Sequence, residues 1–252
     1  GIDVAADRYP YTASCTDLDI TLPGWALYDG KAAVLARLAD ADTRKKIRAE
    51  ILEGRGEFGF GIIMIGSTEH PDLQRFKGLY LPDAAKELNM EPVDALLHIV
   101  EKDELRTGGI FFGMSEENMW KILAQPWVMI GCDASIRAPD GILSKDHPHP
   151  RAYGSFTKVL RAALDGRAAP LPETIRKMTS LPAEHFRLNG RGVLKKGNFA
   201  DVAVFDPQAI EEKSTYANPH QLSAGIAALV VNGTLTIKDG NLTGERSGKF
   251  LD

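Results

Sequence analysis

The sequence predicts an α/β protein, and three observations carry this prediction. The run Val128–Ser135 (VMIGCDAS) begins with apolar residues and leads into Asp133, as in a buried strand with a carboxylate at its C-terminal end. A second apolar run, Gly109–Met114, precedes it by one helix, which gives a strand, helix, strand order of normal length. Near the C-terminus, Asn232-Gly233 between two apolar runs predicts a β-hairpin.

Asp133 is the first candidate functional residue. The carboxyl ends of the strands form the reactive face of a (β/α) barrel, so an acid at this position is a candidate for catalysis. The alternative is that Asp133 caps the turn that follows the strand. The sequence pattern alone leaves both interpretations open.

The composition of the chain limits the classes of partner and location that we expect. The chain has 252 residues, of which 44% are hydrophobic and 25% charged, as in ordinary globular proteins. A net charge of −4, without a basic stripe, gives no sign of a nucleic-acid partner. Apolar runs such as Ile226–Val231 are far shorter than the roughly 20 residues that span a bilayer, so we expect no membrane partner and a cytoplasmic location. We expect Cys15 and Cys132 to be outside disulfides.

The chain begins with a predicted strand, Ile2–Ala6, which Pro10 turns into a loop. Tyr9, Tyr11 and Ser14 then lie on this loop, where their hydroxyls are available to a polar ligand. The alternative is that the two tyrosines pack over the rim of the sheet. Because the first residues read as the middle of a larger sheet, we expect the chain to be a fragment.

Residues 17–107 form mixed short elements over about ninety residues, whereas a strand–helix–strand unit needs roughly thirty. This length predicts an inserted subdomain or lid. Its expected helices and strand are Lys31–Leu38, Asp42–Leu52, Phe58–Ile65 (the strand), Leu81–Leu88 and Asp94–Lys102. We expect its histidines, His70 and His98, to lie on the surface or on helix faces.

After the predicted lid in the sequence, Ser115 is the expected N-cap of a helix that ends near Leu123. The loop that follows Asp133 contains His147 and His149, a spacing that can chelate a metal. Proline follows both histidines and no third ligand stands nearby, which argues against a metal site. Arg151 lies at the foot of this loop, which leads into a predicted helix at Tyr153–Leu164, and its guanidinium can bind a substrate carboxylate; the alternative is a salt bridge that fixes the loop.

The C-terminal part changes character. Two short helices are expected first, and a small β-subdomain follows them. The predicted elements are the helices Pro172–Lys177 and Pro182–Phe186 and the strands Val202–Phe205, Ala227–Val231 and Thr234–Lys238.

Several motifs together carry a family resemblance. The strand ending in Asp133, Met178–Ala183 (MTSLPA), Gly192–Asp201 (GVLKKGNFAD) and Val231–Gly233 (VNG) resemble the C-terminal half of an amidohydrolase-superfamily enzyme. More narrowly, Asp7–Ser14 (DRYPYTAS), the IGCDAS strand and His149–Phe156 (HPRAYGSF) resemble the D-aminoacylases, also called N-acyl-D-amino-acid deacylases.

The resemblance implies a fold. It is the C-terminal part of a (β/α) TIM-type barrel with an inserted lid subdomain and a small C-terminal β-sandwich portion. The expected segments are a barrel strand and loop at 1–16, the lid at 17–107, barrel units with the acid at 108–190 and the β-subdomain at 191–252.

The resemblance also implies zinc-dependent hydrolysis of the N-acyl amide of a D-amino acid. The aspartate matching Asp133 would act as general base, and the family's carboxylate-binding groups match Arg151 and Tyr9, with Ser14 a weaker candidate. The family's metal ligands lie upstream of the position of Gly1. We therefore expect the zinc ligands outside this chain, and neither cysteine matches the ligand cysteine of the family.

Two alternatives remain at this point. One is another amide or cyclic-amide hydrolase of the same superfamily. The other is a non-catalytic half-barrel that works by association with another chain. Because a cut barrel exposes strand edges, we expect the isolated chain to bind a missing N-terminal half or to self-associate.

Overall fold

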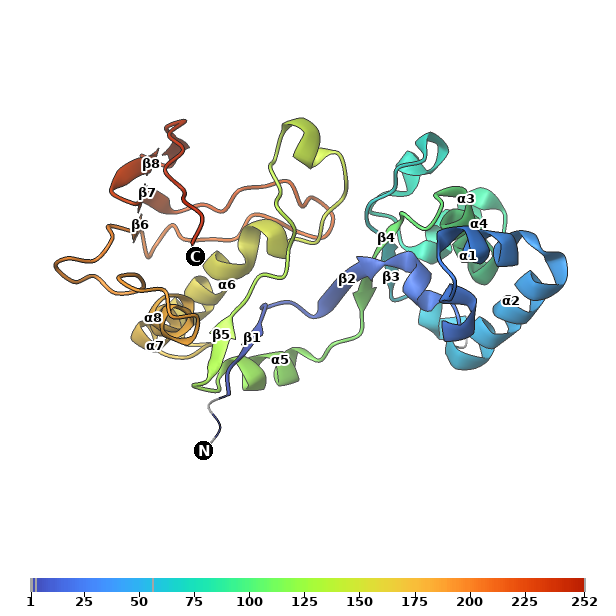
Figure 1. The fold of residues 1–252 in the computed structure, drawn as a ribbon, viewed down its shortest axis with the longest axis horizontal. Helices are drawn as coiled ribbons and strands as arrows, with labels where there is room; N and C mark the ends of the chain where they lie inside the picture. The colour runs from blue at the N-terminus through green and yellow to red at the C-terminus, as the bar shows by residue number, and fades with distance from the viewer. Residues whose placement is uncertain (1, 3, 56, 252) are drawn as a thin grey trace. The chain divides into compact units, whose positions relative to one another are not determined.

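The computed structural model describes residues 2, 4–55 and 57–251, except for the side chains of residues 57 and 58. It confirms the α/β class, and its residues form two compact units (Figure 1). The first unit contains Gly1–Tyr11, Ser115–Pro139 and Pro150–Asp252, and the second contains Thr12–Met114 and Asp140–His149. Among the described residues, no helix has the length and apolar character needed to cross a membrane.

The first unit contains a parallel pair of short strands, β1 (Ala6–Arg8) and β5 (Val128–Ile130), which lie side by side (Figure 1). All three residues of β5 are buried, as expected from the sequence. The expected strand Ile2–Ala6 is wrong in its position. Val4 is exposed and pairing begins at Ala6, because the chain meets its partner at Val128 and continues to Arg8; Asp3 lies outside the described residues.

Helices α5 (Glu116–Leu123), α6 (Arg151–Leu164) and α7 (Leu171–Met178) pack against this pair of strands. The short helix α8 (Ser180–His185) packs against α7. Ser115 is the N-cap of α5, as predicted, and its Oγ accepts a hydrogen bond from the Asn118 amide at 3.2 Å. The buried apolar cluster of the unit joins α5, β5 and α6 through Met119, Leu123, Ile130 and Val159.

The C-terminal β-subdomain is an antiparallel sheet in the order β6-β7-β8-β9. Its strands are β6 (Val202–Phe205), β7 (Ile226–Val231), β8 (Thr234–Lys238) and β9 (Asn241–Leu242). The predicted hairpin joins β7 and β8. Asn232 and Gly233 both have positive φ, 49° and 82°, as a two-residue hairpin turn of this type requires.

The second unit contains a three-stranded antiparallel sheet in the order β2 (Ala13–Asp17), β4 (Gly108–Phe112), β3 (Ile63–Ile65). Two expectations fail here. Ser14 was expected on a loop but lies within β2, where it pairs with Phe111 of β4. The strand expected at Gly109–Met114 forms as β4, but its pairing is antiparallel and not that of a barrel strand.

Four helices pack around this sheet within the second unit: α1 (Lys31–Ala39), α2 (Ala41–Arg55), α3 (Leu81–Leu88) and α4 (Pro92–Lys102). All four correspond to predicted helices. The short 3-10 helices are η1 (Leu18–Thr21), η2 (Gly24–Leu27), η3 (Glu57–Phe60), η4 (Pro71–Phe76) and η5 (Gly141–Ser144). The strand expected over Phe58–Ile65 is limited to β3, since η3 precedes it.

Candidate functional site

Asp133 lies three residues beyond the end of the buried strand β5. Its φ of 54° is in the left-handed region, which aspartate tolerates better than most side chains do. The turn leaves 69% of its side chain exposed. The amide of Gly131 donates to the carbonyl of Arg8 at 3.0 Å, so the backbone before Asp133 is fixed to β1. Asp133 is therefore an accessible carboxylate on a fixed backbone.

Arg151 is the first residue of α6 and meets Asp133 directly. Its Nη2 lies 3.1 Å from Asp133 Oδ2, and only 8% of the arginine side chain is exposed. Its backbone carbonyl accepts hydrogen bonds from the Cys132 thiol at 3.2 Å and from Ser155 Oγ at 2.9 Å. The result is a guanidinium buried along its length with its end at the candidate acid.

Tyr9 lies beside two guanidinium groups. The Cζ of Arg151 is 4.7 Å from the centre of the Tyr9 ring, and the Cζ of Arg8 is 4.3 Å from the same centre. Both distances are within the range of a cation–π interaction. Arg8 also donates from Nη2 to the carbonyl of Tyr11 at 2.8 Å. Tyr9, Arg151 and Asp133 are thus brought together in one cluster of the first unit.

A supporting network lies behind this cluster, and sequence reasoning missed most of it. The buried Tyr11 donates from its hydroxyl to Glu212 Oε2 at 2.8 Å, and Lys158 Nζ pairs with Glu212 Oε1 at 3.0 Å. Burial, followed by the neighbouring Glu212 carboxylate, raises the pKa of Tyr11. This tyrosine therefore remains a neutral hydrogen-bond donor and serves as a fixed point, which agrees with a packing role more than with ligand binding.

Ser14, the weaker binding candidate, belongs to the second unit. It lies in β2 opposite Phe111, and its side chain is partly buried. Cys15 follows it in the same strand, and neither it nor Cys132 is disulfide-bonded. The cluster of Asp133, Arg151 and Tyr9 belongs to the first unit.

The two loop histidines also belong to the second unit and do not form a ligand set there. His149 is buried, with Nε2 at 3.0 Å from the carbonyl of Ala13. The ring of His147 packs against Gly78 so closely that an added Cβ would lie 2.8 Å from its Cε1. Within residues 2, 4–55 and 57–251, no group of three His, Cys, Asp or Glu side chains is placed to hold a metal ion.

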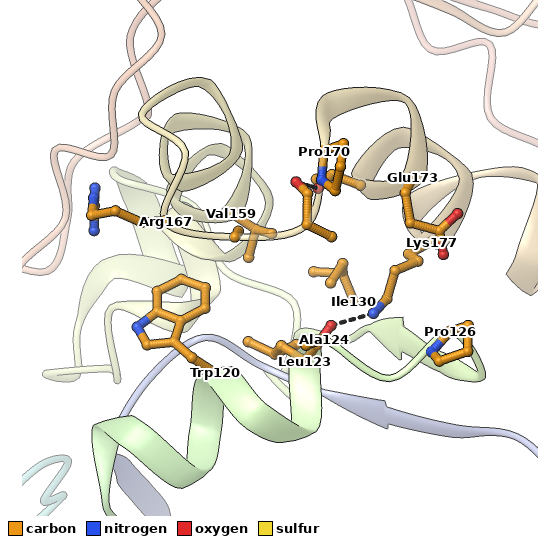
Figure 2. Close-up of a pocket in the computed structure, with 13 residues that line it drawn as sticks. Trp120, Leu123, Ala124, Pro126, Ile130, Val159, Arg167, Pro170, Glu173 and Lys177 are labelled. Atoms are coloured by element: carbon orange, nitrogen blue, oxygen red, sulfur yellow. Dashed lines mark hydrogen bonds between the residues drawn. The ribbon is translucent and has the colours of Figure 1, made fainter.

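A cavity of about 570 Å³ lies elsewhere in the first unit, between α5, β5, α6 and α7 (Figure 2). Trp120 and Val159 line it, and Lys177 extends along its wall toward the end of α5. Lys177 Nζ donates to the carbonyls of Leu123 and, at 2.8 Å, Gln125. Burial lowers the pKa of Lys177. None of the candidate site residues lines this cavity. The amine of Lys177 is a structural group, because it binds the carbonyls at the end of α5.

Comparison with known sequences gives related proteins, although no family model matches the chain. The chain is 32% identical over 234 residues to N-acyl-D-glutamate deacylase from Alcaligenes xylosoxydans xylosoxydans, which covers 92% of this chain and 38% of that protein. It is 39% identical over 145 residues to D-aminoacylase from the same organism, which covers 57% of this chain and 28% of the relative. The chain therefore spans well under half the length of these relatives.

Comparison with solved structures agrees. The N-acyl-D-glutamate deacylase of Bordetella bronchiseptica, solved with zinc and a phosphonate inhibitor, matches with a TM-score of 0.68 at 30% identity. The match covers 94% of this chain and 40% of that protein.

Proposed function

Because this chain is a homologue of the D-aminoacylase family, matching the C-terminal part of its members, we propose that it belongs to an enzyme that hydrolyses N-acyl-D-amino acids. The bond cleaved is the N-acyl amide. This chain contributes the general base and part of the substrate pocket. The observation that carries the proposal is the contact of Asp133 with Arg151 beside the ring of Tyr9, in a chain that is homologous to the D-aminoacylases.

Asp133 is the proposed general base. Its carboxylate accepts a proton from the attacking water and then gives that proton to the nitrogen of the leaving amine. Two features of the chain suit this role. The carboxylate is exposed, so water and substrate can reach it, and the strand pairing before it limits its movement.

Arg151 and Tyr9 are the proposed binding groups for the substrate's carboxylate, with Ser14 a weaker candidate. A guanidinium binds a carboxylate through two parallel N–H donors. In the substrate-free chain Asp133 already pairs with Arg151. An arriving substrate carboxylate therefore competes with Asp133 for the guanidinium and releases the base to act on water. This exchange would favour substrates that carry a free carboxylate.

Zinc is the proposed metal of the complete enzyme. The solved Bordetella relative contains zinc. The described residues of this chain do not fit a metal by themselves, since no three potential ligands gather among them. We place the zinc ligands of the complete enzyme outside these residues.

The finer architecture is also a proposal. Parallel pairing of β1 with β5, and α5 between them in the chain, suit two neighbouring strands of a (β/α) barrel. The inserted lid would be the segment 17–107, which lies within the second unit. The antiparallel strands after residue 191 would be part of the C-terminal β-sandwich.

The test uses the protein encoded by the complete gene, with N-acyl-D-amino acids, their L-enantiomers and their primary amides as substrates. Asp133→Asn should lower kcat by about 10²–10⁴-fold. It should also lower KM for the acid substrate, because a neutral amide competes less than a carboxylate for the Arg151 guanidinium. Arg151→Met should raise KM for the acid substrate by about 10–100-fold, because it removes a hydrogen bond between charged groups worth roughly 1.5–3 kcal/mol.

Arg167→Met is the matched control, since Arg167 is exposed and pairs with Asp165 away from the cluster. It should leave both constants unchanged. The proposal fails when the protein shows no preference for N-acyl-D-amino acids, or when both site variants behave like the control.

A further inference from the structure

Arg8 contacts both sides of the cluster formed by Asp133, Arg151 and Tyr9. Its backbone belongs to β1 and is paired with Ile130 of β5, and its carbonyl accepts the hydrogen bond from the Gly131 amide at 3.0 Å. Gly131 is two residues before Asp133. The main chain of Arg8 therefore fixes the segment that carries the proposed base.

The side chain of Arg8 contacts the binding part of the cluster, at Tyr9. Its guanidinium lies 4.3 Å from the centre of the Tyr9 ring, the ring that also meets Arg151 at 4.7 Å. Arg151 in turn meets Asp133 at 3.1 Å. These contacts form a closed series. The series leads from Arg8 through Tyr9 and Arg151 to Asp133, and the Gly131 amide connects the segment of Asp133 back to Arg8.

The guanidinium of Arg8 is itself fixed. Its Nη2 donates to the carbonyl of Tyr11 at 2.8 Å, across the turn at Pro10. The Tyr11 side chain is buried and bound to Glu212, and Lys158 lies 4.4 Å from the centre of its ring. Arg8 therefore joins the Tyr9 ring to a fixed point of the unit.

We propose that Arg8 is a positioning residue that sets the orientation of Tyr9 and, through it, of the Arg151 guanidinium that receives the substrate's carboxylate. This proposal rests on the function proposed above. Arg8 itself does not contact the substrate. Its effect should therefore appear in carboxylate recognition, which is KM for acid substrates, and only weakly in the chemical step.

Arginine suits this position better than other cations. A planar guanidinium stacks on a ring and donates in its own plane at the same time, whereas the ammonium of lysine is a compact point charge. Arg8→Met keeps a long apolar side chain near Tyr9 but removes the charge and the donors. Arg8→Lys keeps the charge and tests whether charge alone is sufficient.

The experiment measures kcat and KM for an N-acyl-D-amino acid, and kcat/KM for its primary amide, in the protein from the complete gene. Arg8→Met should raise KM for the acid about tenfold, leave kcat within about twofold, and change kcat/KM for the amide less than about twofold. Arg8→Lys should recover part of the loss. Arg167→Met, an arginine paired away from the cluster, serves as control.

Thermal unfolding of each variant shows whether it remains folded. An equal loss on acid and amide substrates, or no loss at all, overturns the proposal. Full recovery by Arg8→Lys also overturns it, because charge alone would then be sufficient and stacking of the guanidinium on Tyr9 would have no role. Arg151→Met is measured in parallel. If it loses acid recognition while Arg8→Met does not, only this inference fails. If Arg151→Met has no effect, the carboxylate-binding role of Arg151 fails and the inference fails with it; the proposed function fails as well when Asp133→Asn also behaves like the control.

Discussion

At the scale of single residues, the first unit uses charged side chains in two different ways. Asp133 is exposed and paired with a buried arginine, so its carboxylate can exchange partners with a ligand. Lys177 is only 1% exposed, and its amine is held by the carbonyls of Leu123 and Gln125 at the end of α5. A helix end leaves carbonyls without partners in the helix, and this lysine supplies their donors.

Lys177→Met should destabilise the chain by about 1–3 kcal/mol, because the buried carbonyl of Leu123 and the partly buried carbonyl contact at Gln125 lose a charged donor. Burial lowers the pKa of Lys177 in the folded chain below its ordinary value of about 10.5. Between these two pKa values the unfolded chain binds more protons than the folded chain, so the unfolding free energy rises with pH.

Denaturant unfolding at several pH values measures this effect. The stability difference between wild type and Lys177→Met should grow as the pH rises toward 10.5. Lys195→Met, at an exposed position, should change stability by less than about 0.5 kcal/mol at every pH. A difference that shrinks with rising pH would mean that the amine is not desolvated.

At the scale of elements, the sequence predicted those whose ends carry local signals. The helix α3 has the bounds expected from the sequence, and local features mark both of its ends: a proline lies in its first turn, and Asn89 follows its end in the left-handed conformation. The hairpin at Asn232-Gly233 is a second case. The strand β2 was missed because its sequence, ASCTD, is polar, and its partner β4 is distant along the chain.

The candidate site divides in the same way. Asp133 and Arg151 stand at element ends that the sequence indicates, and their chemistry made them candidates. The supporting contacts leave no local signal. The hydrogen bond from Tyr11 to Glu212 joins residues 201 positions apart, and nothing around either residue predicts it.

This long-range contact reverses an ordinary rule for helices. Gly154 lies in α6, where alanine normally adds about 0.5–1 kcal/mol of stability. A Cβ at this position would lie 2.5 Å from Tyr11 Oη and 3.2 Å from Glu212 Cβ. Gly154→Ala should therefore destabilise the chain by about 1–3 kcal/mol, because the buried hydrogen bond must move.

Gly54 in α2 is the matched control. A Cβ there meets no atom within 4 Å, so Gly54→Ala should stabilise the chain by about 0.5–1 kcal/mol. Denaturant unfolding of both variants measures the pair. Stabilisation by both substitutions would show that the Tyr11 and Glu212 contact is loose.

At the scale of the whole molecule, the two units differ in how much apolar surface they bury. The second unit contains a large cluster that joins its helices to its sheet, with Leu38, Ile47, Phe76, Leu96 and Val100 all fully buried. The buried cluster of the first unit is the small group around Ile130 that joins α5, β5 and α6. In the same unit, Leu194 and Phe199 are 75% and 51% exposed.

This difference predicts unequal local stability in the 252-residue chain. Burial of apolar surface supplies most of the free energy that keeps backbone amides closed to exchange, at roughly 25 cal/mol per Å². In hydrogen exchange followed by mass spectrometry, amides of α4 in the second unit should exchange at least about 100-fold more slowly than those of α8 and β6 in the first. Amides of β5 should lie between them, because its three residues are fully or nearly buried and Ile130 belongs to the small cluster. Equal protection of α4 and β6 would mean that the two units unfold together, and the smaller core would then not limit the first unit.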